Sequence, residues 1–250
     1  NKNFDDVIKD NEIGNDIQDH TNLRINVLTN KKIGSFNEIS NNFYLKFLTF
    51  MKHLVGIPTV MKGTGATSAA HLDLNSDGIV DTRIQIVQFS ETGRHGSDGK
   101  IFSSDQPGFS LSITVINPRS RGIIELDGKE LKIDPRYLSK DEDVEMLEKA
   151  LSFCMKLLKS KPINEHILKI EDRNTIEKNP KKYIFENIFS GAHLSGGIHK
   201  LVDNNFRLKD FKGLYVCDAS VLEKYVASNM HSSVVLIADM FAKNFAKNIM

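Results

Sequence analysis

The chain has 250 residues, of which 40% are hydrophobic, and its 33 basic and 32 acidic side chains leave a formal net charge of +1. This balance gives no electrostatic reason to expect nucleic acid or an anionic membrane as a partner, and no apolar run approaches the roughly 18 residues of a membrane span. The length fits one large domain or two small ones, with enough apolar residues to bury a core.

Three strands are predicted in the first half of the chain, where apolar and polar residues alternate, at 23–28, 83–89 and 109–117. From Phe36 to Leu54 the apolar residues recur with helical period, and Ser35 with Glu38 forms a capping box. We interpret this aromatic stripe as core, with a hydrophobic substrate channel as the alternative. Residues 90–108 are rich in Gly, Ser and Asp and are long enough to form either a lid or a disordered excursion.

The segment Asp73–Asp81 copies the first half of a calcium loop, but Ile84 stands where a bidentate Glu is needed, so we expect a surface turn and no metal. Cys154 and Cys217 lack metal-ligand spacing and lie in apolar contexts, which predicts free thiols. Free thiols favour a reducing, cytoplasmic location.

In the second half of the chain, Asp127-Gly128 is typical of a two-residue hairpin turn between strands at 123–126 and 131–133. An amphipathic helix is expected after Ser139. The continuous apolar run 214–217 predicts a strand buried on both faces of a parallel sheet, and an apolar stripe from residue 234 on predicts a final helix.

Three motifs follow one another near the C terminus: HLSGG at 193–197, GLYVCDASV at 213–221 and NMHSSVVLIA at 229–238. In this order they resemble the C-terminal signature of the glucose-methanol-choline (GMC) oxidoreductases, a family of flavoenzymes. EIGNDIQDHTNL at 12–23 and the segment from PRSRG to KIDPRYL at 118–138 are similar to further parts of that family.

The resemblance implies an α+β fold in three parts. Residues 1–22 would end an FAD-binding α/β domain, 23–188 would form a substrate-binding domain with an antiparallel sheet flanked by helices, and 189–250 would return to the FAD-binding domain. The glycine fingerprint of such a domain is absent from the sequence. We therefore expect the N-terminal FAD-binding half on a missing segment or another chain, and the Asn start indicates a fragment or a processed product.

The resemblance also implies the chemistry, in which FAD takes a hydride from a small-molecule alcohol. His193 would take the proton, a step that suits imidazole, and His231 would hydrogen-bond the substrate oxygen. Alone, each histidine is better explained as a loop or cap residue, but together, each inside its own motif, they favour an active site. His20 is interpreted as a hydrogen-bonding residue at the domain junction. Cofactor contacts are implied at the turn and at the helix start, at Asp218, Ala219, His231, Ser232 and Ser233.

Two alternatives to alcohol oxidation stay open. A relative of the family could use the same pocket for non-redox chemistry, as hydroxynitrile lyases do. The chain could also be a truncated fragment that is inactive without its FAD-binding half. Arg119 and Arg121 are interpreted as turn residues in surface ion pairs, with a grip on a carboxylate substrate as the alternative.

Overall fold

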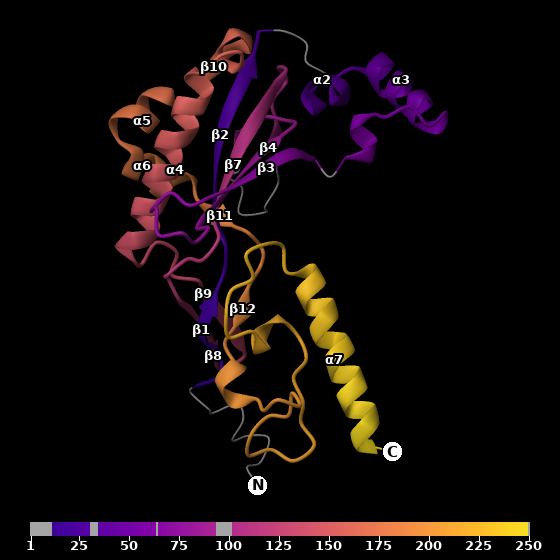
Figure 1. Cartoon of the computed structure of the whole chain (residues 1–250), viewed down its shortest axis with the longest axis vertical. Coiled ribbons are helices and arrows are strands. Elements are labelled where there is room, and N and C mark those ends of the chain that lie inside the picture. Colours follow the sequence, from indigo (N-terminus) through magenta and orange to yellow (C-terminus); the bar gives the residue numbers. More distant parts are fainter. Residues whose placement is uncertain (1–11, 31–34, 64, 94–101, 250) are drawn as a thin grey trace. The chain divides into compact units, whose positions relative to one another are not determined.

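The computed structural model describes residues 12–30, 35–63, 65–93 and 102–249, and its chain path is drawn in Figure 1. The chain forms two compact units. Unit 1 comprises residues 1–21, 115–144 and 189–250, and unit 2 comprises 22–114 and 145–188. The structure thus groups 115–144 with the terminal segments, whereas the sequence analysis placed them in the domain 23–188. Residues 1–11 and part of the expected lid, 94–101, lie outside the described residues.

Unit 2 is built on an antiparallel sheet with the strand order β10–β2–β7–β4–β3. Its strands are β2 (Thr21–Thr29), β3 (Ala66–Leu72), β4 (Thr82–Val87), β7 (Gly108–Val115) and β10 (Ile167–Ile170). The three strands predicted by alternation are therefore confirmed as β2, β4 and β7.

The two central strands carry one apolar and one polar row. Leu23, Ile25 and Val27 of β2 pair with Ile113, Leu111 and Phe109 of β7, and Leu23, Ile25, Val27, Leu111 and Ile113 are buried. The polar partners Ser110, Ser112 and Thr114 are buried as well. Alternating strands are expected to expose their polar row to solvent. In β7 that row is buried instead, and its hydroxyls donate to side chains of β2, from Ser110 to Asn26 and from Thr114 to Asn22.

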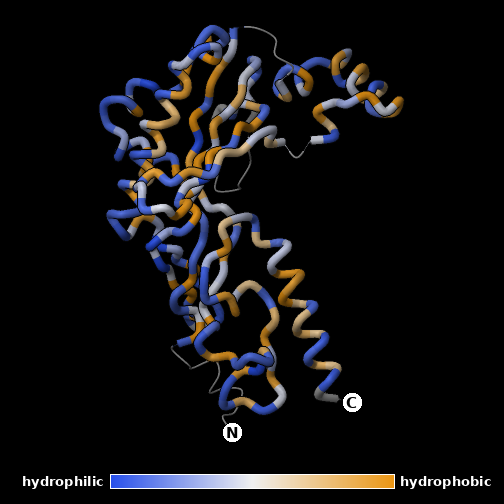
Figure 2. Tube along the Cα trace, viewed as in Figure 1, coloured by the Kyte–Doolittle hydropathy of each residue, from blue (hydrophilic) through white to orange (hydrophobic). Residues whose placement is uncertain are grey.

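Three helices pack on one side of the sheet. Figure 1 shows α4 (Asp141–Lys159), α5 (Arg173–Lys178) and α6 (Pro180–Asn187) on the same side of β2 and β7. The apolar stripe of α4 is buried at Leu147, Leu151, Cys154 and Leu158. Tyr183 of α6 donates a hydrogen bond from its hydroxyl to the carbonyl of Arg24 on β2. Figure 2 shows the hydrophobic residues that these strands and α4 bring together.

The helix predicted from Phe36 to Leu54 is two helices, α2 (Phe36–Ser40) and α3 (Phe43–Leu54). The predicted start is confirmed, since the Ser35 hydroxyl accepts from Glu38 N. The break comes at Asn42, whose side chain accepts from Leu45 N and so caps a new helix. No residue of α3 is buried, and its aromatic stripe faces outward. The interpretation of that stripe as core is wrong.

Unit 1 contains an antiparallel sheet with the strand order β12–β1–β8–β9. The strands are β1 (Asn15–Gln18), β8 (Gly122–Asp127), β9 (Glu130–Asp134) and β12 (Ser195–Gly196). The predicted hairpin is confirmed, with Asp127 opposite Glu130 and a positive φ at Gly128. Gly122 has to be glycine, because a Cβ there would lie 2.3 Å from the carbonyl oxygen of Asp134.

The rest of unit 1 is a long irregular segment and the helix α7 (His231–Ile249), which confirms the predicted final helix. The predicted strand at 214–217 is wrong: an isolated antiparallel bridge joins Tyr215 to Arg207. A strand forms only where a neighbour supplies backbone partners, and here that single bridge is the pairing of the segment. Instead, ring contacts hold this segment on α7, through Phe206, Tyr215, Phe241 and Phe245. The fold class, α+β with antiparallel sheets flanked by helices, is confirmed.

Asn37 fastens α2 to unit 2. Its side-chain nitrogen donates to the carbonyls of Ser90 (2.9 Å) and Ser104 (2.8 Å), and its oxygen accepts from Ser90 N at 2.9 Å. The side chain is fully buried. One amide therefore satisfies three backbone groups that cannot reach water.

We predict that Asn37→Ala lowers the free energy of unfolding by roughly 2–4 kcal/mol, because it leaves three buried backbone groups without a partner. Denaturant unfolding followed by circular dichroism measures this change. The control is Asn41→Ala, at an exposed neighbour with one 3.3 Å hydrogen bond to Ser104 O, where we expect less than about 1 kcal/mol. Equal losses in the two variants would contradict this role.

Candidate functional site

The loop that carries His193 lies between β11 (Phe189–Ser190) and β12, and Asp19 and His20, directly after β1, hold it. The Nδ1 atoms of His193 and His20 are 2.9 Å apart, with the rings edge to face. His20 O accepts from Gly191 N at 2.8 Å, and a Cβ at Gly191 would clash with His20. His20, interpreted from the sequence as a hydrogen-bonding residue, thus hydrogen-bonds the predicted base.

Asp19 fixes the same loop with its carboxylate. One oxygen accepts from the backbone N–H of His193 at 2.9 Å. The other accepts from the hydroxyls of Ser190 and Tyr137. The carboxylate is buried, so these donors replace the water that it loses on folding.

Tyr225 completes the cluster around the two histidines. Its ring centroid lies 4.2 Å from that of His20, and its hydroxyl donates to His193 O at 3.1 Å. Burial, and then the charge of Asp19, raises the pKa of Tyr225 above its ordinary value. Burial and the hydrogen bond with Asp19 likewise raise the pKa of Tyr137. Both phenols therefore stay protonated near neutral pH and remain donors.

The contact between the two Nδ1 atoms constrains the tautomers, because one of the two must carry a proton and the other a lone pair. If His193 Nδ1 donates to His20 Nδ1, then the lone pair of neutral His193 is on Nε2. In that arrangement His193 can accept a proton at Nε2 without losing its hydrogen bond to His20. The bond then becomes charge-assisted, and it strengthens as the proton arrives.

The second predicted histidine, His231, is the first residue of α7, and its side chain is exposed. The contacts given above for His193 are with Asp19, His20 and Tyr225, and His231 is not among them. Ser232 and Ser233 occupy the first turn of α7, which has no acidic residue. The exposed Asp218 caps the short helix η4 (Ala219–Val221) by accepting from Ser220 N at 2.8 Å.

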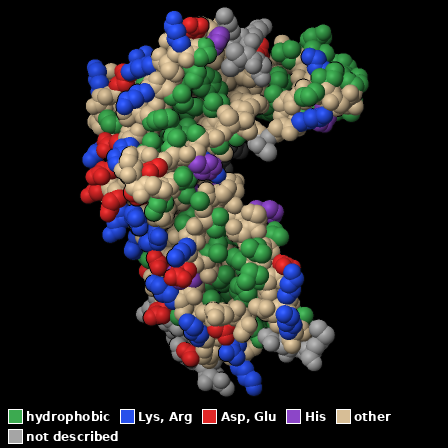
Figure 3. Space-filling model, viewed as in Figure 1, with side chains coloured by type: hydrophobic (Ala, Val, Ile, Leu, Met, Phe, Trp, Pro, Cys, Tyr) green, Lys and Arg blue, Asp and Glu red, His purple; other side chains and the backbone are tan. Residues whose placement is uncertain are grey.

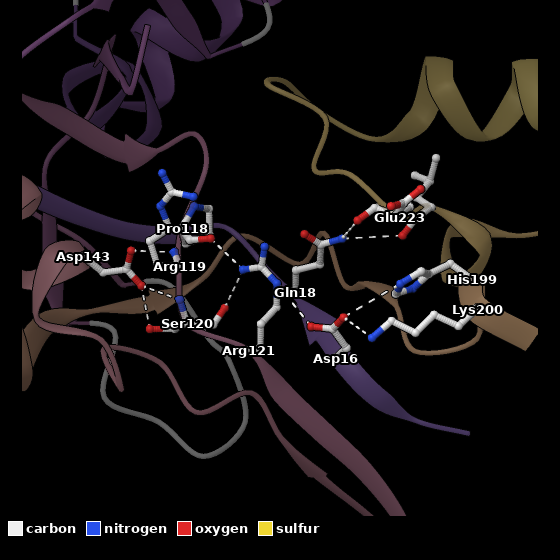
Figure 4. Close-up of polar contacts among 11 residues, drawn as sticks. Asp16, Gln18, Pro118, Arg119, Ser120, Arg121, Asp143, His199, Lys200 and Glu223 are labelled. Atoms are coloured by element: carbon white, nitrogen blue, oxygen red, sulfur yellow. Dashed lines mark hydrogen bonds and ion pairs between the residues drawn. The ribbon is translucent and has the colours of Figure 1, made fainter. Parts of the chain in front are cut away.

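The strand β1 also anchors the PRSRG turn and the loop after β12, as Figure 4 shows. Asp16 lies 3.5 Å from Arg121 Nε and 3.1 Å from Lys200 Nζ, and the guanidinium of Arg121 donates to Pro118 O. Arg121 thus forms a surface ion pair, the first of its two interpretations. Gln18 donates to the carbonyl of Glu223 at 3.1 Å, so β1 holds segments from three parts of the sequence.

The start of α4 fixes the same turn. The buried carboxylate of Asp143 accepts from the backbone N–H groups of Arg119 (2.7 Å) and Ser120 (2.8 Å), and from the Ser120 hydroxyl (Figure 4). Asp143 therefore holds the PRSRG turn through three donors.

The sequence analysis missed three residues of the His193 cluster, which are Asp19, Tyr137 and Tyr225. Asp19 and Tyr137 lie inside segments that the resemblance singled out, at 12–23 and 118–138, and this was the available signal. Tyr225 follows the GLYVCDASV motif without a motif of its own. Only the fold brings it to His20.

Two cavities lie elsewhere. One of about 350 Å³ in unit 2 has mostly apolar walls, including Phe109, Leu111 and Leu158, and one of about 220 Å³ in unit 1 lies along residues 197–201. Neither is lined by His193 or His231. Within the described ranges no group of three or more His, Cys, Asp or Glu residues is placed to hold a metal, and no helix has the length and apolar character to cross a bilayer.

Comparison with known proteins gives a family match over residues 118–238, to the C-terminal domain of the GMC oxidoreductases. A glucose dehydrogenase [FAD, quinone] from Drosophila pseudoobscura pseudoobscura is 24% identical over 223 residues, which cover 78% of this chain and 35% of that protein. A pyridoxine 4-oxidase from Microbacterium luteolum is 28% identical over 165 residues, covering 58% of this chain and 31% of that protein. The chain therefore spans about a third of the length of these relatives.

Solved structures share the fold. A pyridoxine 4-oxidase from Mesorbium loti matches with a TM-score of 0.73 and 19% identity, over 94% of this chain and 44% of that one. A formate oxidase variant from Aspergillus oryzae RIB40 matches with a TM-score of 0.81 and 12% identity, over 95% of this chain and 48% of that one. The family match, the shared fold and the order of the motifs agree, and residues 118–238 match the C-terminal domain of the GMC oxidoreductases.

Proposed function

We propose that this chain is the C-terminal part of an FAD-dependent oxidoreductase that oxidises a small-molecule alcohol, with His193 as the base. The observation that carries the proposal is the His193 cluster, in which a buried carboxylate, a buried imidazole and a tyrosine hold a single loop histidine. A histidine whose position is fixed by several buried groups is typical of a residue that transfers protons. The match to the GMC oxidoreductases over residues 118–238 supports the type of reaction.

His193 would remove the proton from the substrate hydroxyl. For this step its Nε2 needs a lone pair, which the arrangement with Nδ1 donating to His20 provides. Asp19 fixes the backbone of the loop, and Tyr225 fixes it from the other side of His193. His231, at the start of α7, would hydrogen-bond the same substrate oxygen, and two imidazoles so placed can each donate and accept.

The start of α7 fits an anionic group. The first turn of a helix has backbone N–H groups without intrahelical acceptors, and here it carries the small residues Ser232 and Ser233 and no acidic residue. FAD, when bound, supplies the acceptor for the hydride that leaves the alcohol carbon. His231, Ser232 and Ser233 would line one edge of its ring system, while Asp218 and Ala219 would lie beside its phosphate-ribitol part.

A flavin-binding half is the partner that this proposal requires, since the 250 residues hold no dinucleotide-binding fingerprint. The outer face of α7 supports such a partner, because Val235, Leu236 and Met240 are exposed there. A helix that carries apolar residues on its solvent face commonly packs against another domain.

The first prediction concerns flavin chemistry. The chain joined to or coexpressed with a GMC flavin-binding half should purify with a flavin absorption spectrum, and an alcohol substrate should bleach that spectrum without oxygen. Anaerobic absorption spectroscopy with a panel of primary alcohols measures this. A bound flavin that no alcohol reduces, together with cleavage of a cyanohydrin, would replace this proposal with non-redox lyase chemistry.

The second prediction tests the base. In the assembled enzyme, His193→Ala should lower kcat by roughly 10²–10⁴-fold, the range for loss of a general base, and leave the flavin bound. Steady-state kinetics and the flavin-to-protein ratio measure the two effects. His71→Ala, at an exposed histidine on β3, is the control and should leave kcat unchanged. Full turnover in His193→Ala would remove His193 from the chemistry.

The third prediction tests His20 as a positioning residue. His20→Phe keeps the ring volume but removes the acceptor for His193 Nδ1–H, so kcat should fall by roughly 10–100-fold with a nearly unchanged KM. His20→Asn places an amide oxygen near the position of Nδ1 and should recover part of kcat. Equal kcat in the two variants would mean that His20 contributes only packing.

A further inference from the structure

Helix α3 presents its apolar face to solvent. Six of its twelve residues share one side of the helix, within an arc of about 120° at 3.6 residues per turn. All six are exposed: Phe43, Tyr44, Phe47, Phe50, Met51 and Leu54. In an ordinary surface helix this is the face that packs on the core. In α3 the arrangement is inverted, and Figure 3 shows hydrophobic side chains gathered over this part of unit 2.

The exposure is extensive and continues beyond the helix. Phe43 is 86% exposed, and Leu54 is 61% exposed. Val55, Ile57 and Met61, in the turn that follows α3 and in η1 (Val60–Lys62), are exposed as well. Nine large apolar side chains thus form one surface, which we call the α3 face. An apolar surface of this size on one element marks a contact with another molecule.

The charge around the α3 face has one sign. Lys46 and Lys52 are exposed on the two sides of the apolar arc, and the ammonium of Lys62 folds back onto Gly56 O, at the C-terminal end of α3. No Asp or Glu occurs between residues 39 and 72. The net charge of +1 for the whole chain therefore conceals a segment that carries three lysines and no acid.

The charge selects among the molecules that could cover this face. A symmetric contact between two copies would bring the lysines of both copies together, with no acidic residue of the segment to neutralise them. A lipid surface with anionic headgroups fits both features. Phe, Leu and Met side chains enter the region between headgroups and acyl chains, and flanking lysines reach the phosphates.

We propose that the α3 face binds anionic lipid bilayers and attaches the protein to a membrane surface without spanning it. The cap at Asn42 and the buried Asn37 set the direction of the helix, because they turn the chain at Asn41–Asn42 and fasten α2 to unit 2. The apolar arc supplies the insertion, and Lys46, Lys52 and Lys62 supply the preference for negative charge.

The experiment is co-sedimentation of the chain with vesicles, either of phosphatidylcholine alone or of equal parts phosphatidylcholine and phosphatidylserine. We expect binding to the mixed vesicles, at least tenfold tighter than to pure phosphatidylcholine and weakened by added salt. Phe47→Ser/Phe50→Ser and Lys46→Glu/Lys52→Glu should each lower this binding by about tenfold or more.

Control variants outside the α3 face, and sedimentation velocity to detect a dimer, test whether this face binds lipid. Leu126→Ser/Leu131→Ser changes two exposed apolar residues of the β8–β9 hairpin, and Lys178→Glu/Lys181→Glu changes two exposed lysines of unit 2; both should bind as the unchanged chain does. Circular dichroism verifies that each variant folds. Equal binding to both kinds of vesicle, or equal losses in test and control variants, would overturn the proposal. So would a dimer in sedimentation velocity that Phe47→Ser/Phe50→Ser dissociates, or loss of vesicle binding when a flavin-binding half is attached.

Discussion

The buried carboxylate of Asp19 is the contact on which the organisation of the candidate site depends. It accepts hydrogen bonds from the His193 backbone and from the hydroxyls of Ser190 and Tyr137. Removing any of these donors would leave part of a buried charge unsatisfied, which is costly in a protein interior. The loop is therefore held at several points at once, and His193 is presented to His20 in one orientation.

Polar side chains of β1 likewise hold chain segments that are far apart in sequence. Asp16 pairs with Arg121 and Lys200, and Gln18 reaches the carbonyl of Glu223. An exposed ion pair contributes little to stability by itself. Here its effect is positional, because the pairs at Asp16 fasten the PRSRG turn and the loop after β12 to the strand that leads into Asp19 and His20.

Surface composition has to be considered locally in this chain. The nearly neutral total gave no electrostatic reason to expect an anionic partner, yet residues 39–72 carry three lysines, no acid and an outward apolar helix face. The hydrophobic period of α3 was correctly recognised, but period alone does not say on which side of a helix the core lies. Asn41 is the C-cap of α2, and the side chain of Asn42 caps the start of α3, so these two residues set the direction of the helix.

The sequence by itself determined the antiparallel strands, the hairpin at Asp127-Gly128, the final helix and the resemblance to the GMC oxidoreductases, because these follow from local periodicity, turn chemistry and short motifs. It also placed His20 as a hydrogen-bonding residue. The tertiary structure decided what depends on distant partners. The run 214–217 is not a strand here, because its pairing is one isolated antiparallel bridge. The aromatic stripe of α3 is exposed because no described part of unit 2 covers it. Tyr225 and Tyr137 lie near His193 only in the folded chain. The buried Asp19 carboxylate and the buried His20 imidazole contact these two tyrosines although they are distant in sequence.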